Sequence, residues 1–70
     1  MDKLSQEYIL NIVFNESLDR EQLLLKKYDN IYDDIKDKDI KNIIKEFAKN
    51  SREHVDILKD KMVMLNIKKT

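Results

Sequence analysis

The hydrophobic positions of the chain form two stripes with the spacing of α-helices. The first stripe steps by four and three residues and consists of Phe14, Leu18, Glu21, Leu25, Tyr28, Tyr32 and Ile35. The second stripe repeats this stepping and consists of Ile40, Ile44, Phe47, Ser51, His54, Leu58, Met62 and Leu65. A period close to 3.5 residues is typical of helices that pack along one seam. The pattern therefore predicts two helices packed against each other.

A short segment of mixed charge, "DDIKDKDIK", separates the two stripes. It predicts a first helix over about residues 3–35, a turn over about 36–39 and a second helix over about 39–67, with Asp37 or Asp39 as the N-cap. A connection this short makes the two helices antiparallel neighbours. The predicted architecture is a long helical hairpin.

The N-terminal run "YILNIVF" is apolar on nearly all sides, so its periodicity alone does not separate a helix from a strand. Its continuation into "NESLDREQLLLKKY" without glycine or proline favours a helix. Asn15 and Ser17 are both residues that can cap a new helix. A break in the first helix near these two residues stays open at this point.

The composition supports an all-α chain, because its 70 residues include no glycine and no proline. The length fits one domain, residues 1–70. Fourteen basic and fourteen acidic residues cancel, which argues against nucleic-acid and anionic-membrane partners. No apolar run approaches the roughly 18 residues of a membrane span, and the N-terminal residues do not resemble a secretion signal. We expect a cytoplasmic protein or one built into an intracellularly assembled structure.

Further apolar positions make each stripe wider than a two-helix seam needs. These positions are Leu10, Val13, Leu24 and Ile31 in the first helix and Ile43, Val55, Ile57 and Met62 in the second. A single hairpin would leave them in water. A homodimer that forms a four-helix bundle would cover them. An adaptor that binds a helix of another protein through Leu10, Val13 and Leu24 is an alternative.

Three polar residues interrupt the two stripes, and the hairpin brings them to one level. In a hairpin that turns near residue 37, residues whose numbers add up to about 75 lie at the same height. Glu21 therefore lies opposite His54, with Ser51 one helical turn away, and Tyr28 lies opposite Phe47. We expect Glu21, Ser51 and His54 to form a polar centre inside the bundle.

This arrangement resembles the ferritin-like four-helix proteins, especially small two-helix, spore-coat-like members built as half bundles. That family carries an inward Glu on the first helix of each pair, a Tyr seven residues later and E-x-x-H on the second helix. Glu21, Tyr28 and His54 match these positions, and "REHVDILKDKMVMLNI" resembles the family's run from the His onwards. The resemblance implies a homodimeric ferritin-like bundle with a spore-coat association.

Ser51 departs from the family pattern, because it stands where the family has the metal-bridging Glu. A dimer would then offer two Glu and two His in place of four Glu and two His. Di-iron oxidase or ferroxidase chemistry is not expected, and the absence of cysteine leaves no support for thiol catalysis.

Three interpretations of the polar centre remain, the third of which is a different register that leaves His54 in solvent. In the first, Glu21, Ser51, His54 and Tyr28 form a buried polar network in a non-catalytic structural or interaction protein without a cofactor. In the second, Glu21 and His54 of both chains share one Fe, Mn or Zn ion. The first is the predicted function, with a second copy, or another coat or helical protein, as the partner.

Overall fold

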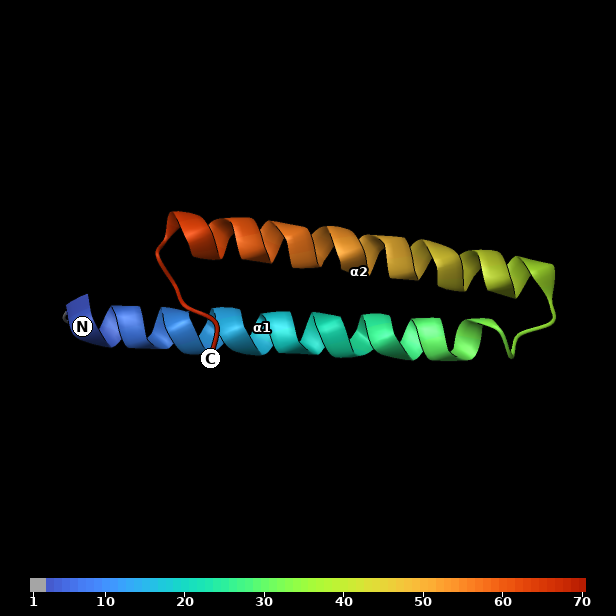
Figure 1. Cartoon of the computed structure of the whole chain (residues 1–70), viewed down its shortest axis with the longest axis horizontal. Helices are drawn as coiled ribbons and strands as arrows, with labels where there is room; N and C mark the ends of the chain where they lie inside the picture. Colours follow the sequence, from blue (N-terminus) through green and yellow to red (C-terminus); the bar gives the residue numbers. More distant parts are fainter. Residues whose placement is uncertain (1–2) are drawn as a thin grey trace.

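The computed structural model is an antiparallel hairpin of two α-helices (Figure 1). It describes the backbone of residues 3–70 and the side chains of residues 6–70, so Met1 and Asp2 of the predicted domain lie outside the described residues. Helix α1 runs over Lys3–Tyr32 and α2 over Lys38–Met64, and no strand occurs in residues 3–70. Within the same residues, neither helix has an apolar stretch long enough to cross a membrane. The predicted all-α hairpin is confirmed.

The turn between the helices starts earlier than predicted. Helix α1 ends at Tyr32 instead of residue 35, because the chain tightens into a turn in which the Asp34 amide donates to the Ile31 carbonyl at 3.0 Å. Asp37 is the N-cap of α2, since its carboxylate accepts from the amides of Asp39 at 2.9 Å and Ile40 at 3.1 Å. The charged segment thus closes the hairpin by satisfying the first free amides of α2.

Helix α2 ends at Met64, three residues before the predicted end. Asn66 takes the left-handed conformation with a φ of 57°, which asparagine tolerates better than most residues. The Ile67 amide then donates to the Met62 carbonyl at 2.8 Å, and the Asn66 amide donates to the Val63 carbonyl at 3.1 Å. This pair of bonds is a Schellman motif, and it turns residues 67–70 back towards α1 (Figure 1).

Helix α1 continues unbroken through Asn15–Ser17, so the alternative of a new helix start there is wrong. The buried side chain of Asn15 instead binds the C-terminal segment, and we call this contact the C-terminal clasp. Its amide nitrogen donates to the Lys68 carbonyl at 3.0 Å, and its amide oxygen accepts from the Thr70 amide at 2.9 Å. Lys69 also pairs with Asp19. One side chain therefore holds the main chain of residues 68–70 against α1.

Replacing Asn15 with Ala should release residues 67–70 and lower the free energy of unfolding by about 1–3 kcal/mol, because the two hydrogen bonds of the buried Asn15 side chain to residues 68 and 70 are lost. Urea unfolding followed by circular dichroism measures the loss, and hydrogen exchange at the Thr70 amide reports the release. Asn30→Ala, on the exposed part of α1, is the matched control. An unchanged exchange rate at Thr70 would contradict the clasp.

The seam between the helices follows the prediction on α1 and differs from it on α2. All seven predicted positions of the first stripe are buried or half-buried. On α2 the packed positions are Lys41, Ile44, Ala48, Ser51, Val55, Leu58 and Met62. Four predicted members, Ile40, Phe47, His54 and Leu65, are exposed instead. The helix is rotated so that the small Ala48 and the compact Val55 face α1.

The core that results is small. Among the described side chains, the buried apolar residues are Leu18, Ala48, Val55 and Met62. Val55 was predicted only for an outer row and Met62 also for the stripe, and with Leu18 both form the centre of the core. The hairpin measures 52 × 17 × 16 Å and has a radius of gyration of 15.6 Å, against about 11 Å for a compact 70-residue domain. The fold is therefore an elongated two-helix hairpin with a small core.

Candidate functional site

The two sides of the hairpin differ sharply in chemistry. On one side, charged residues of the two helices face each other, and Arg52 lies 3.9 Å from Asp29. We call this side the polar face. It consists of Gln22, Asp29, Lys45, Arg52 and Lys59, all of which are exposed. The C-terminal segment crosses the same side near Gln22 and Lys59, because a groove there is also lined by Ile67 and Lys69. The polar face is therefore charged and partly covered.

The opposite side is apolar and uncovered in the hairpin, and we call it the apolar face. It consists of Leu10, Leu24, Ile31, Ile40, Ile43, Phe47 and Ile57. Leu24 is half-buried and the other six are 41–52% exposed. Exposed apolar residues grouped on one side mark an interaction surface more often than scattered ones do.

Helical spacing gathers these residues along two neighbouring edges. Leu10, Leu24 and Ile31 lie at multiples of seven residues along α1, so they share one edge of that helix. On α2, Ile40 and Phe47 are also seven residues apart, so they share one edge of that helix. These edges meet because α1 and α2 touch there through aromatic and polar side chains.

Two contacts across the helices locate this junction. The rings of Tyr28 and Phe47 lie with centroids 5.9 Å apart at an interplanar angle of 49°, a favourable tilted arrangement. Nearer the middle of the hairpin, Nδ1 of His54 lies 3.3 Å from Oε1 of Glu21. The sequence predicted that the two residues of each pair lie at the same height along the hairpin. Both distances confirm this register of α1 against α2.

His54 itself lies elsewhere than predicted. Its side chain is 58% exposed, whereas that of Glu21 is 24% exposed, so the prediction that His54 is buried in the seam is wrong. The rotation of α2 that directs Ala48 and Val55 to α1 moves His54 out of the seam and onto the side of the apolar face, beside Glu21. The pair with Glu21 is ionic when the imidazole is protonated.

Ser51 and Tyr28 also fall outside a single network with His54. Ser51 is buried in the seam, at 4% exposure. The hydrogen bonds among the described residues do not join Ser51 to Glu21 or to His54. Tyr28 is half-buried and packs its ring on Phe47. Of the four residues predicted to form the polar network, only Glu21 and His54 have polar side-chain atoms close to each other.

A shallow groove of about 330 Å³ opens beside this pair on the apolar face. It is lined by Ser17, Arg20, Glu21, His54, Ile57 and Leu58. Arg20 was not singled out by the sequence. Its position seven residues before Lys27, on the same edge of α1, is the signal that could have found it. The groove thus places Arg20 next to Ile57 of the apolar face.

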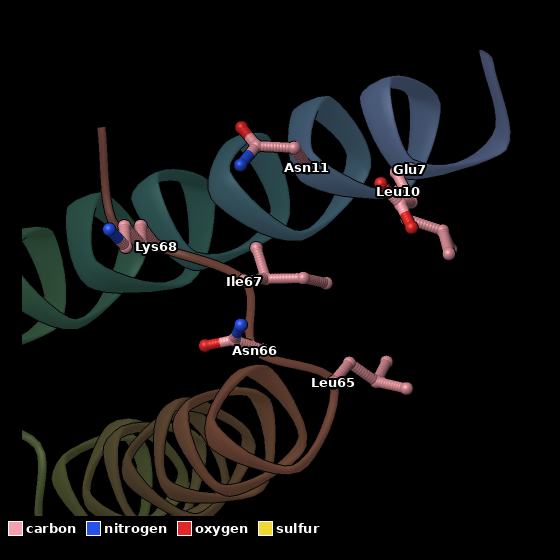
Figure 2. Close-up of a pocket in the computed structure, with 7 residues that line it drawn as sticks. All are labelled: Glu7, Leu10, Asn11, Leu65, Asn66, Ile67 and Lys68. Carbon is pink, nitrogen blue, oxygen red and sulfur yellow. The ribbon is translucent and has the colours of Figure 1, made fainter. Parts of the chain in front are cut away.

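A larger hollow of about 550 Å³ lies at the open end of the hairpin (Figure 2). Figure 2 shows Ile67 between the C-terminal segment and α1, with Leu10 and Leu65 to one side. Glu7, Asn11, Asn66 and Lys68 complete the lining. The hollow follows from the turn at Asn66 and from the length of α1, which extends past the end of α2 (Figure 1).

Metal binding needs more ligands than one hairpin provides. Within residues 3–70 no group of three or more His, Asp or Glu side chains is arranged to hold a metal ion. Glu21 and His54 supply one carboxylate and one imidazole side by side. A four-ligand site of the kind that Zn²⁺ prefers would therefore require two copies of the chain.

Comparisons with protein-family models, with curated proteins and with solved structures found no match to this chain. The resemblance to ferritin-like half bundles, including its spore-coat association, therefore stays a prediction. Functional conclusions rest on the geometry of the apolar face and of its central Glu21–His54 pair.

Proposed function

We propose that this chain is a non-catalytic structural or interaction protein whose hairpin pairs with a second copy to form a homodimeric four-helix bundle. The observation that carries the proposal is the contrast between its two faces. The polar face is charged and partly covered by the C-terminal segment, whereas the apolar face exposes six large hydrophobic residues. A second hairpin on the apolar face would remove these residues from water.

The accessible surface supports this proposal. The chain exposes 5800 Å², whereas a monomeric globular protein of 8.5 kDa is expected to expose about 4,700 Å². The excess of about 1,100 Å² is comparable to the roughly 800 Å² that each partner buries in a standard protein interface. One self-association through the apolar face would therefore account for the excess.

Thermal unfolding at several protein concentrations tests the proposal. Association stabilises the folded state by mass action, so the unfolding temperature should rise as the concentration rises. Circular dichroism at 222 nm follows the loss of helix. An unfolding temperature that is the same at micromolar and submillimolar concentrations would refute homodimerisation.

A second candidate function, a metal ion shared between two copies, is favoured by the 3.3 Å contact between Glu21 and His54. In a dimer built on the apolar face, each copy would contribute one carboxylate and one imidazole. Imidazole and carboxylate ligands suit zinc, manganese and iron. If Glu21 and His54 are only structural partners, in contrast, the stability of the dimer does not depend on metal.

Zinc separates the two functions, because an ion that binds only the folded dimer stabilises it by about 2.7 kcal/mol at 100 times its dissociation constant. If Glu21 and His54 are only structural partners, excess Zn²⁺ should leave the unfolding temperature of the dimer unchanged. His54→Gln keeps a polar side chain and removes the imidazole ligand, so it is the control. A zinc-dependent rise that disappears in His54→Gln would contradict the structural role and support the shared ion.

A further inference from the structure

We infer that the two hairpins of the dimer lie parallel, with both turns at the same end and with α1 of each copy against α2 of the other. This inference rests on the proposed homodimer and adds its orientation. It is carried by the charges that border the apolar face on each helix.

Two orientations allow the apolar faces of two identical hairpins to meet around a two-fold axis. With the axis along the helices, α1 lies on α2 of the second copy and the turns coincide. With the axis across the helices, α1 lies on α1, α2 lies on α2, and the turns are at opposite ends. The two arrangements bring different rows of charged residues together.

The row that borders the apolar face on α2 is entirely acidic. Glu46, Glu53 and Asp60 follow each other at intervals of seven residues, and all three are exposed. They lie on the side of Ile43 and Ile57 that points away from α1, since they are three or four residues from these two apolar positions. Placing α2 on α2 with Glu53 near Glu53 of the second copy would oppose acid with acid along the whole row, which disfavours the crosswise dimer.

The corresponding row on α1 carries two basic residues. Arg20 and Lys27 are exposed and seven residues apart. Arg20 lines the groove beside His54 and Ile57, and Lys27 lies four residues before Ile31 on the same helix edge. In the parallel dimer these two cations face the acidic row of the second copy.

The register within the hairpin determines which charges meet. Because Glu21 lies beside His54 and Tyr28 beside Phe47, Arg20 lies within two residues, or about 3 Å, of the level of Glu53, and Lys27 lies equally close to the level of Glu46. Rotation about an axis along the helices keeps these levels, so each cation meets one carboxylate of the second copy. Glu16 would lie near both Asp60 and Lys61 of that copy, where the two charges offset each other.

The centre of the face favours the same orientation. Glu21 and His54 lie at one level of the hairpin. In the parallel dimer, Glu21 of each copy lies across from His54 of the other, so carboxylate and imidazole alternate around the axis. In the crosswise dimer, Glu21 would instead approach Glu21 of the second copy. The carboxylate–imidazole pairs at the centre and the opposite charges at the rim thus favour the same orientation.

Charge reversal tests the orientation while keeping helix-forming residues at every position. The double variant Arg20→Glu/Lys27→Glu makes both rims acidic. The quadruple variant adds Glu46→Lys/Glu53→Lys. In the parallel dimer it restores opposite charges on the two rows that face each other. Lys26→Glu/Lys49→Glu changes the net charge equally at exposed positions off the apolar face and is the control.

Sedimentation equilibrium at low salt measures the dissociation constant of each dimer, because salt screens such exposed pairs. The double variant should dissociate about tenfold more readily than the natural chain, and the quadruple variant should recover most of this loss. The control should match the natural chain. A double variant that dimerises as tightly as the natural chain would overturn the parallel orientation. A natural chain that is monomeric would instead refute the proposed homodimer itself.

Cysteine cross-linking reads out the orientation directly, since the chain has no cysteine of its own. Oxidation of Arg20→Cys/Glu53→Cys should give a covalent dimer, while Glu53→Cys alone should remain a single chain on a non-reducing gel. A covalent dimer from Glu53→Cys alone would place α2 on α2 and overturn the inference. The absence of a covalent dimer from the double variant would overturn it as well.

Discussion

Replacing Leu18 with Ala should leave the chain largely unfolded at low micromolar concentration. Leu18 is 2% exposed and packs with Val55 and Met62 at the centre of the core. Truncating a buried leucine costs about 2–5 kcal/mol, because the transfer free energy of the removed atoms is lost and a cavity remains. A core this small rarely supplies more than about 3–5 kcal/mol in total, so the loss removes most of the stability.

The measurement is the helical signal in circular dichroism at 25 °C, together with the urea midpoint. Leu23→Ala is the matched control, because Leu23 lies on the same helix with 53% of its surface exposed. We expect that control to unfold close to the natural chain. If Leu18→Ala and Leu23→Ala had the same midpoint, Leu18 would not lie at the centre of the core.

The second large effect is expected at the apolar face, where Ile57→Glu should weaken the dimer at least about a hundredfold. Ile57 is 52% exposed in the hairpin and lines the groove beside His54. The second copy would bury it, and burying a carboxylate in an apolar interface without a matched partner costs several kcal/mol. The hairpin itself should keep its helices, since position 57 faces solvent within a single copy.

Val63→Glu is the control for this variant, because Val63 is 81% exposed and is not part of the apolar face. Sedimentation velocity at matched concentrations compares the two. We expect Ile57→Glu to sediment as a monomer and Val63→Glu as a dimer. Equal loss of the dimer in both variants would mean that another surface of α2 carries the contact.

Much of the hairpin could be predicted from the sequence, because the pattern that indicates helices is local. The apolar period and the absence of glycine and proline indicated two helices, and the mixed-charge segment placed the turn and limited the N-cap to Asp37 or Asp39. The levels of Glu21 with His54 and of Tyr28 with Phe47 followed from the position of the turn alone. These features depend on spacing along the chain and not on which helix faces pack together.

The face that α2 presents to α1 could not be predicted in the same way. The edge with Ile40 and Phe47 is more hydrophobic than the edge with Lys41 and Ala48, so hydrophobicity alone favours the first edge. The structure packs the second edge, because small side chains allow the two helices to approach closely. The displaced Ile40 and Phe47 therefore become part of the apolar face, and His54 lies beside them.

The C-terminal clasp was also beyond sequence reasoning. The predicted second helix continued to about residue 67, because Leu65 and Ile67 extend its apolar pattern. The left-handed residue Asn66 ends it earlier, and buried Asn15 binds the main chain 53 and 55 residues further on. Contacts of this kind join a side chain to main-chain groups, and main-chain groups leave no mark in the sequence.

Sedimentation equilibrium of the natural chain tests the central claim most directly. The account predicts a molecular mass of twice 8.5 kDa at high micromolar concentration, with dissociation on dilution and loss of helix in parallel. A mass of 8.5 kDa at every concentration, with the helices fully formed, would contradict the account, because the apolar face would then be stable in water without a second copy.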